Sequence, residues 1–323
     1  MPDASPDPPP AFHADTIERP DDPRLEVFRD VRDRDLRSRE GLFMAESERV
    51  LRRLVRRPER LHSVLLSPGR RVDLDDLVRQ LPPEVPVHVA PMDIICRIAG
   101  FHVHRGVLAA GRRPRSEDLT IDAALGHLAG RPHLTILVAE GITNVDNIGG
   151  LFRNAAAFGV DGVLIDPTCC DPLYRKAIRV SAGHVLSTPW AMATEWPADL
   201  IQLRERLGVS LVAAELTQES RPTWEIDAFG AARTALVFGS EARGVSADAL
   251  AACDAVAEIP MAAGVPSLNV ATSSAVMLYE RQRRVETGLG GPGGGGVEDG
   301  SAGEAGQGPG IIAAASGEPP ATH

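Results

Sequence analysis

The sequence lacks several features that mark other classes of protein. It has no Cys-x-x-Cys spacing among its four cysteines, which are Cys96, Cys169, Cys170 and Cys253. No stretch approaches the roughly 18 consecutive apolar residues of a membrane span. The first 22 residues are acidic and rich in proline, where a secretory leader would be apolar. We therefore predict a cytoplasmic protein whose thiols are reduced.

An excess of positive charge is also missing. The chain has 34 basic and 44 acidic residues, a net charge of −10, which at first sight argues against binding to nucleic acid. Both ends, 1–22 and 287–323, are acidic, and the residues between them are close to neutral. Within that body, 23–71 is dense in arginine. This arginine fits either a nucleic-acid surface or helices whose exposed charges pair with one another.

The two ends are low in complexity. Residues 1–22 are dominated by Pro and Asp, and 287–323 by Gly, so neither can bury enough apolar surface to offset its ordering entropy. We predict a disordered leader and a disordered tail with these bounds. Gly288, Gly290 and Gly293 have the spacing of a dinucleotide fingerprint. No strand pattern precedes them, so we do not interpret them as a nicotinamide site.

Residues 23–111 are predicted to form a small α/β module, and 112–120 a linker. Helical patterns alternate there with short strand patterns. The helices are expected at 25–37, 45–57, 73–80 and 91–98, and the strands at 63–67, 85–90 and 106–111.

Residues 121–286 are predicted to form a second α/β domain. Uninterrupted apolar strands that alternate with helices indicate a parallel sheet covered on both faces. In such sheets ligands lie at the carboxyl ends of the strands. The strands are expected at 134–140, 161–166, 209–216, 234–241 and 256–261, and the helices at 148–158, 172–182, 246–252 and 267–285.

Three polar turns follow strands of this second domain. After the first strand, Asn147 is a suitable N-cap for the next helix, and Arg153 lies six residues further on. The planar guanidinium of arginine suits a phosphate group. The second turn contains Ser240 and Glu241 between glycines, and the third leads through Ser267 into a helix of small residues. Small residues let a helix press against another backbone or a ligand.

These turns resemble the three motifs of the SpoU/TrmH family of SPOUT methyltransferases. The matching patterns are Asn-x-Gly-x-x-x-Arg-Asn at 147–154, Phe-Gly-Ser-Glu-x-x-Gly at 238–244, and Ile-Pro-Met followed by Ser-Leu-Asn-Val at 259–270. The module at 23–111 is similar to the ribosomal-protein-like RNA-binding domain of many members. The resemblance covers 23–286.

The resemblance implies a trefoil-knotted, parallel-sheet methyltransferase domain at 121–286. It implies transfer of a methyl group from S-adenosyl-L-methionine to a ribose 2′-hydroxyl in tRNA or rRNA. It also implies a homodimer formed through the knot region. No membrane, DNA or metal is expected; His102 and His104 alternate on a possible strand, but no third ligand of suitable spacing is near.

The resemblance further assigns roles to individual residues. Arg153 is expected to bind the RNA phosphate beside the target ribose or to act as the base, oriented by Asn147 and Glu241. Ser267 and Asn269 would fix the knot loop and the substrate. Backbone groups would hold the donor around Leu216, Gly239, Ile259, Met261 and Leu268. The arginines expected to bind RNA are Arg52, Arg53, Arg56 and Arg57.

Two other functions remain open from the sequence. One is an RNA-binding or assembly factor that keeps the fold without turnover. It would have little reason to keep Arg153, Glu241 and Asn269 together. The other is a base methyltransferase of the same superfamily, which would need a carboxylate that reads the base.

Overall fold

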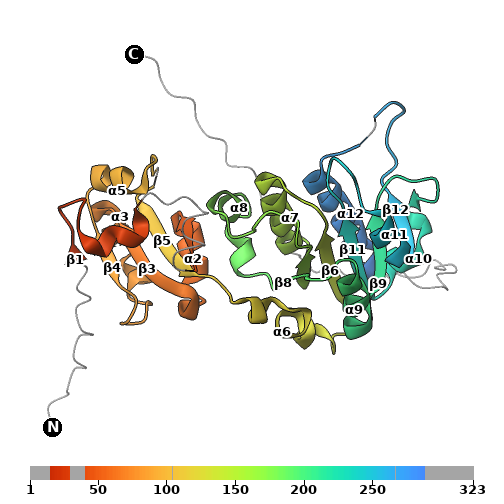
Figure 1. The fold of residues 1–323 in the computed structure, drawn as a ribbon, viewed down its shortest axis with the longest axis horizontal. Coiled ribbons are helices and arrows are strands. Elements are labelled where there is room, and N and C mark those ends of the chain that lie inside the picture. The colour runs from red at the N-terminus through yellow and green to blue at the C-terminus, as the bar shows by residue number, and fades with distance from the viewer. Residues whose placement is uncertain (1–14, 30–40, 104, 266, 288–323) are drawn as a thin grey trace, which may run out of the picture. The chain divides into compact units, whose positions relative to one another are not determined.

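The computed structural model describes residues 15–29, 41–103, 105–265 and 267–287, which form two sheets with their helices (Figure 1). Residues 1–14 of the predicted leader and 288–323 of the predicted tail lie outside this range, as does His104. Within the described ranges, no helix is both long and apolar enough to cross a membrane.

The first sheet is mixed and belongs to the N-terminal module. Strands β3 and β4 are parallel, whereas β5 runs antiparallel to both β3 and β2. Its first strand begins inside the predicted leader: Asp15 and Thr16 pair with β4 and Ile17 is 1% exposed, so the leader cannot extend to residue 22. The strand order is β1 (Asp15–Thr16), β4 (Val87–Val89), β3 (Leu61–Leu66), β5 (Val107–Arg112) and β2 (Leu42–Glu46).

Two predicted helices of this module are wrong in part. The helix expected from residue 45 begins at Glu48, because Leu42–Glu46 pairs with β5 as an edge strand and buries its apolar side chains. The helix expected at 73–80 is two short helices that meet at Leu74. Most of the pattern at 25–37 lies outside the described residues; its start is a 3-10 helix at Pro23–Phe28. The α-helices are α2 (Glu48–Leu54), α3 (Pro68–Asp73), α4 (Asp75–Val78) and α5 (Met92–Ala99).

The second sheet has seven strands, and every pairing in it is parallel. This confirms the parallel sheet that the apolar runs predict. Strands β8 and β10 were not predicted, because they are only three and two residues long. The strand order is β10 (Arg221–Pro222), β12 (Ala255–Glu258), β9 (Ser210–Ala214), β11 (Arg233–Phe238), β6 (Leu134–Ala139), β7 (Gly162–Ile165) and β8 (Trp190–Met192).

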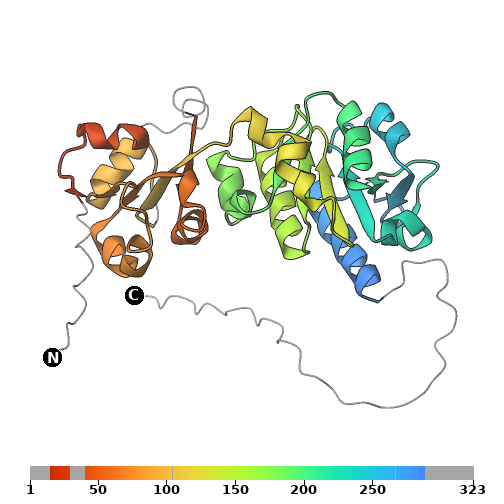
Figure 2. The same cartoon turned by 90° about the horizontal axis from the view of Figure 1, so that it is seen from below.

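Helices cover both faces of this sheet. Alternate side chains of β6 pack into different cores, Leu137 with α7 and α12 on one face and Ile136 with α6 and α9 on the other. Figure 2 shows α12 running along one face beside α7. The remaining helices are α6 (Ile121–Leu125), α7 (Val145–Ala157), α8 (Arg175–Val180), α9 (Ala198–Leu207), α10 (Asp227–Gly230), α11 (Ala247–Ala252) and α12 (Val270–Glu286).

Two buried arginines anchor the end of α12. Arg281 is 1% exposed, and its guanidinium donates to Phe229 O at 2.7 Å, Ala231 O at 2.9 Å and Leu134 O at 3.0 Å. Arg284 donates to the backbone carbonyls of residues 223 and 226. These carbonyls lie where β6 and β11 begin or in the segment before β11. The last described helix is therefore fixed to the side of the sheet where the strands begin, here called the amino edge. Its first turn lies at the side where the strands end, the carboxyl edge.

Candidate active site

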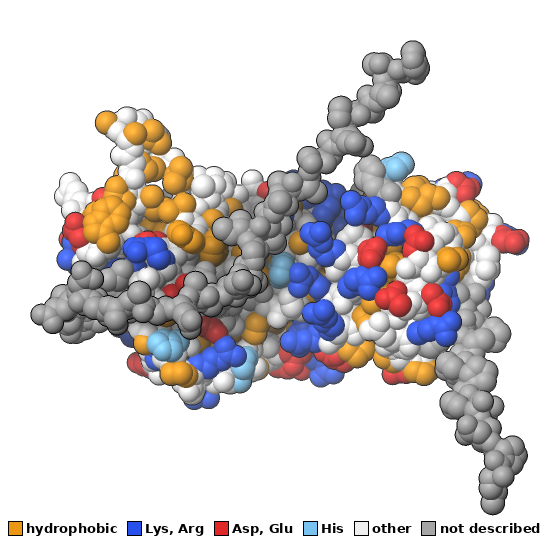
Figure 3. All heavy atoms as spheres, turned by 180° about the vertical axis from the view of Figure 1, so that it is seen from behind, with side chains coloured by type: hydrophobic (Ala, Val, Ile, Leu, Met, Phe, Trp, Pro, Cys, Tyr) orange, Lys and Arg blue, Asp and Glu red, His pale blue; other side chains and the backbone are white. Residues whose placement is uncertain are grey.

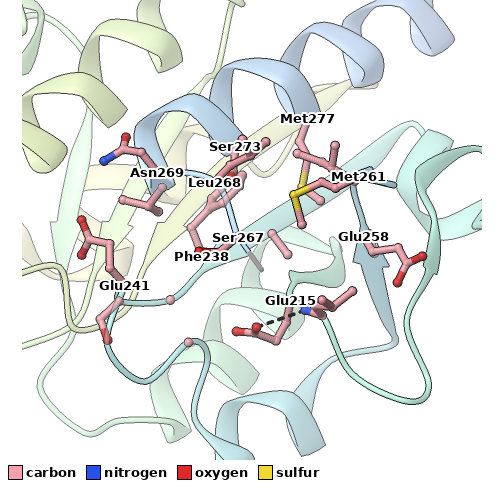
Figure 4. A pocket seen from close by; sticks show the side chains of 18 residues that line it. Glu215, Phe238, Glu241, Glu258, Met261, Ser267, Leu268, Asn269, Ser273 and Met277 are labelled. Carbon is pink, nitrogen blue, oxygen red and sulfur yellow. Dashed lines mark hydrogen bonds between the residues drawn. The ribbon is translucent and has the colours of Figure 1, made fainter. Parts of the chain in front are cut away.

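A pocket of about 290 Å³ opens at the carboxyl edge of β9, β11 and β12 (Figure 4). Its walls come from the segments that follow these three neighbouring strands and from the first turns of α12. Of the residues that the sequence assigned to the polar site, Glu241, Ser267 and Asn269 line it. All of the residues assigned to donor binding line it too: Leu216, Gly239, Ile259, Met261 and Leu268.

The turn after β11 is folded so tightly that it requires glycine at two positions. A Cβ on Gly239 would stand 2.0 Å from the carbonyl carbon of Gly244 and 2.2 Å from the nitrogen of Val245. Gly244 has φ +67, and a Cβ there would meet Glu215 Oε2 at 2.1 Å. No side chain fits such gaps, so only glycine lets the turn close against the end of β9.

Glu215 holds this turn in place. Its Oε2 accepts a hydrogen bond from Val245 N at 2.8 Å, and its Oε1 accepts one from Leu216 N at 3.0 Å. The carboxylate also lines the pocket. Glu215 was not among the predicted site residues, because a glutamate after a strand is common and its partner Val245 is 30 residues away. Its place directly after an apolar strand was the available signal.

Asn147 and Asn269 join the helices α7 and α12. Asn147 is 5% exposed, and its Oδ1 accepts from Asn269 Nδ2 at 3.0 Å. Asn269 Oδ1 in turn caps α12 by accepting from Ala271 N at 3.0 Å. The helices are close here: a Cβ on Gly150 would lie 2.7 Å from Ala271 Cβ. This asparagine pair therefore fixes the first turn of α12, and with it one wall of the pocket.

The predicted capping role of Asn147 is wrong. Helix α7 begins at Val145, and its N-cap is Asn144, whose side chain accepts from Asp146 N at 2.8 Å. Asn144 and Asn147 stand three residues apart before the same apolar pattern, and the sequence alone does not separate them. The structure places Asn147 inside the first turn, where its side chain faces α12.

Arg153 is exposed on α7 and does not line the pocket of its own chain. It forms no hydrogen bond or ion pair within the part of the chain that the structure describes, so neither Asn147 nor Glu241 orients it there. The positive charge of Arg153 acts instead on His184. The pKa of that imidazole is lowered by burial and by the positive charges of Arg53, Arg153 and Arg49.

The four arginines assigned to RNA binding differ in their surroundings. Arg52 pairs with Glu48 and Asp76, and Arg53 donates to Ala182 O at 2.9 Å and contacts His184 Nε2 at 2.7 Å. Arg56 and Arg57 lie beyond the end of α2 at Leu54 and are exposed, so the four do not share one helix. Figure 3 shows a band of Lys and Arg side chains across one face of the molecule.

Comparison with known proteins places this architecture in a family. A family model described as SpoU rRNA Methylase matches residues 134–279. A Mycobacterium bovis protein described as an uncharacterized tRNA/rRNA methyltransferase is 38% identical over 271 residues, 82% of this chain and 90% of that protein. The chain belongs to the SpoU rRNA methylase family. It is thus related to RNA methyltransferases, and the matched segment contains all three polar turns.

Two further proteins resemble this chain, one in sequence and one in fold. The 23S rRNA (guanosine-2′-O-)-methyltransferase RlmB of Escherichia coli is 30% identical over 241 residues, 72% of this chain and 93% of that protein. At the level of fold, the AdoMet-bound rRNA methyltransferase of Sinorhizobium meliloti matches with a TM-score of 0.71 and 21% identity, covering 84% of this chain and 98% of that one. The α/β fold with a parallel sheet is therefore that of SpoU methyltransferases.

Proposed function

We propose that the protein transfers a methyl group from S-adenosyl-L-methionine to a ribose 2′-hydroxyl in tRNA or rRNA. One observation carries the proposal. Every residue assigned to donor binding lines one pocket, together with Glu241, Ser267 and Asn269 of the polar site. The 2′-O position is supported by the activity of the RlmB relative. Binding of the donor is supported by the Sinorhizobium methyltransferase of the same fold, whose crystal structure contains bound AdoMet.

The residues of the pocket fit this donor. The apolar side chains of Leu216, Ile259, Met261 and Leu268 suit an adenine ring, and Gly239 lines the pocket at a point where a side chain would force the turn apart. A volume of about 290 Å³ is near the lower end for small-molecule sites. The donor supplies an electrophilic methyl group; this chain binds it, aligns the hydroxyl and excludes water.

Arg153 acts on the RNA rather than on the donor. Arginine keeps its positive charge in proteins, so binding a phosphate and polarising the hydroxyl is a better role for Arg153 than acting as a free base. Since Arg153 is exposed and outside its own pocket, it serves the pocket of a second copy. A homodimer is supported by Val276 and Tyr279, large side chains of α12 that are 43% and 60% exposed.

The remaining features extend the same proposal. The module at 23–111 binds the RNA substrate, 112–120 links it to the methyltransferase domain at 121–286, and the last part of that domain is threaded as a trefoil knot. In that domain, Glu241 orients the partner copy's catalytic arginine, and Ser267 with Asn269 holds the loop against the substrate. The protein works in the cytoplasm, where tRNA and rRNA are found.

Methyl transfer to RNA tests the proposal directly. Purified protein is incubated with methyl-labelled donor and with total tRNA or rRNA from a strain that lacks its gene, and protection of the neighbouring phosphodiester from alkali identifies 2′-O-methylation. We expect label at one nucleotide in one RNA class. Label on a base would indicate a base methyltransferase. Donor binding without label on either RNA class would support the assembly factor.

A further inference from the structure

The donor pocket is acidic. Of the 18 residues that line it, three are glutamates, Glu215, Glu241 and Glu258, and among these described residues there is no lysine, arginine or histidine. The wall of a site that binds RNA nearby would be expected to be basic. The pocket is therefore negatively charged, whereas a site for an RNA phosphate would be positively charged. The negative charge must act on a ligand inside the pocket.

The three carboxylates come from three neighbouring strands. In the order β12, β9, β11, Glu258 ends the first strand, Glu215 follows the second directly, and Glu241 lies in the turn after the third. The register pairs Ala257 with Ala214, so Glu258 and Glu215 are the next residues of adjacent strands. Figure 4 shows Glu215 below Ser267, with Glu241 and Glu258 on opposite sides of the pocket.

Two of these carboxylates are held by the protein. Glu215 accepts hydrogen bonds from Val245 N and Leu216 N, and Glu258 accepts one from the hydroxyl of Ser220. None of the three is neutralised by an ion pair within the described residues. The fixed charges of Glu215 and Glu258 act on a ligand without the cost of rearranging on binding.

We propose that these carboxylates make the pocket prefer the cationic methyl donor over the uncharged product of its reaction. The inference rests on the proposed function. In the transfer, the ribose oxygen forms a bond to the methyl carbon, the carbon–sulfur bond breaks with its electron pair left on sulfur, and the hydroxyl proton passes to solvent. The sulfonium thereby becomes a neutral thioether, and the net charge of the cofactor falls from +1 to 0.

Because the product is uncharged, the pocket binds the cofactor less tightly once transfer is complete. Coulomb attraction between partly exposed charges contributes modestly, about three- to fivefold in affinity for each pair. Because Glu241 is assigned to the partner copy's arginine, the discrimination rests on Glu215 and Glu258. The uncharged product then leaves in exchange for fresh donor. The pocket thus determines which form of the cofactor it binds as well as where the methyl group points.

Binding measurements on full-length protein test this inference. Calorimetry gives the dissociation constants of S-adenosylmethionine, S-adenosylhomocysteine and sinefungin, an analogue whose amine keeps a positive charge near the position of the sulfonium. The variants are Glu258→Gln, which preserves a partner for Ser220, and Glu215→Gln. Glu219→Gln is the matched control, since Glu219 is exposed and lies outside the pocket.

We expect wild type and Glu219→Gln to bind S-adenosylmethionine and sinefungin more tightly than S-adenosylhomocysteine. Each pocket variant should reduce that ratio about three- to fivefold, and added salt should reduce it in the wild type. An equal loss of affinity for all ligands, or an unchanged ratio in both variants, would overturn the inference and leave the proposed function standing. Failure of the wild type to bind any of the three would overturn both.

Discussion

The two edges of the seven-stranded sheet use charged side chains in opposite ways. At the amino edge, Arg233, Arg281 and Arg284 donate to backbone carbonyls, and Arg281 and Arg284 are buried. At the carboxyl edge, the pocket is lined by carboxylates and open backbone, and Arg153 is exposed and unbonded within the described residues. Burial and partners, rather than residue type, therefore separate an arginine that stabilises the fold from one that is available to a substrate.

The largest effect is expected at the amino edge. Arg281→Met removes the guanidinium that donates to the carbonyls of Phe229, Ala231 and Leu134; of these, Ala231 still accepts from the Thr234 hydroxyl. Each buried group left unpaired costs about 1–3 kcal/mol. We expect a loss of about 3–5 kcal/mol in the free energy of unfolding, measured by urea denaturation. Arg283→Met, an exposed neighbour on the same helix, is the control. If both variants lost the same free energy of unfolding, the buried hydrogen bonds of Arg281 would contribute no more to stability than the exposed side chain of Arg283.

At the carboxyl edge, Arg153→Ala should lower activity without lowering stability. Removing a preorganised charge that acts in the transition state typically lowers the rate about 10²–10³-fold, or roughly 3–4 kcal/mol. Folding should be unchanged because the side chain is exposed, and donor affinity should be unchanged because Arg153 is assigned to the RNA rather than to the donor. Arg153→Lys should recover little activity, since the planar fork is lost. Single-turnover transfer measured beside donor titration checks this; near-normal transfer would remove Arg153 from the reaction.

Gly239→Ala sharpens the comparison within the carboxyl edge. The added methyl would overlap the backbone of Gly244 and Val245, and forcing a close-packed segment apart costs about 1–3 kcal/mol. We expect donor affinity to fall roughly 10- to 100-fold while the domain stays folded. Gly130→Ala is the control, because nothing lies within 4 Å of its added Cβ. Unchanged donor titration in Gly239→Ala would show that the turn does not shape the site.

The arginines around α2 allow a smaller test of the same distinction. Arg56 and Arg57 are exposed, whereas Arg52 and Arg53 are already engaged by protein groups. Changing Arg56 and Arg57 together to alanine should flatten the dependence of RNA affinity on salt by roughly 0.7–0.9 log unit for each RNA phosphate that is no longer neutralised. The Arg52 and Arg53 pair should change the slope less. Equal slopes in both double variants would assign all four to a solvated protein surface.

The smallest effect concerns His184 and acid. Burial and the charges of Arg53, Arg153 and Arg49 lower its pKa in the folded state, so the unfolded chain binds the proton more readily. The contribution to stability is then complete above the unfolded pKa of about 6.5 and is lost as the pH falls through the lower folded value. His184→Gln should reduce the slope of stability against pH below about 6.5. An identical slope in the variant would contradict this linkage.

The sequence was most informative where chemistry leaves few choices. The polar turns around Gly239, Glu241 and Asn269 were identified because a strand, a glycine turn and small helical residues recur together, and the family resemblance assigned the donor residues that now line one pocket. Glu215 was missed because its contact with Val245 joins residues 30 positions apart. Such pairings depend on the strand order, which no local pattern contains.

Burial of charged groups was the other gap. Arg281 lies in the stretch "YERQRRVE", which has the pattern of a solvated helix, and nothing local distinguishes it from exposed Arg283. Its burial follows from the carbonyls that β6 and α10 present at the amino edge. The strand at 42–46 was likewise missed, because its pairing with β5 outweighs the helical pattern around it.

The bonds of Arg281 also bear on how the chain is assembled as it is synthesised. The acceptors come from 134–135 and 229–232, and the donor comes from the last described helix, so these hydrogen bonds form only when that helix is present. Until α12 leaves the ribosome, the carbonyls of Phe229 and Leu134 lack the guanidinium of Arg281, and the pocket lacks the wall that Asn269 begins. Donor binding and the hydrogen bonds of Arg281 therefore become available in the same late step.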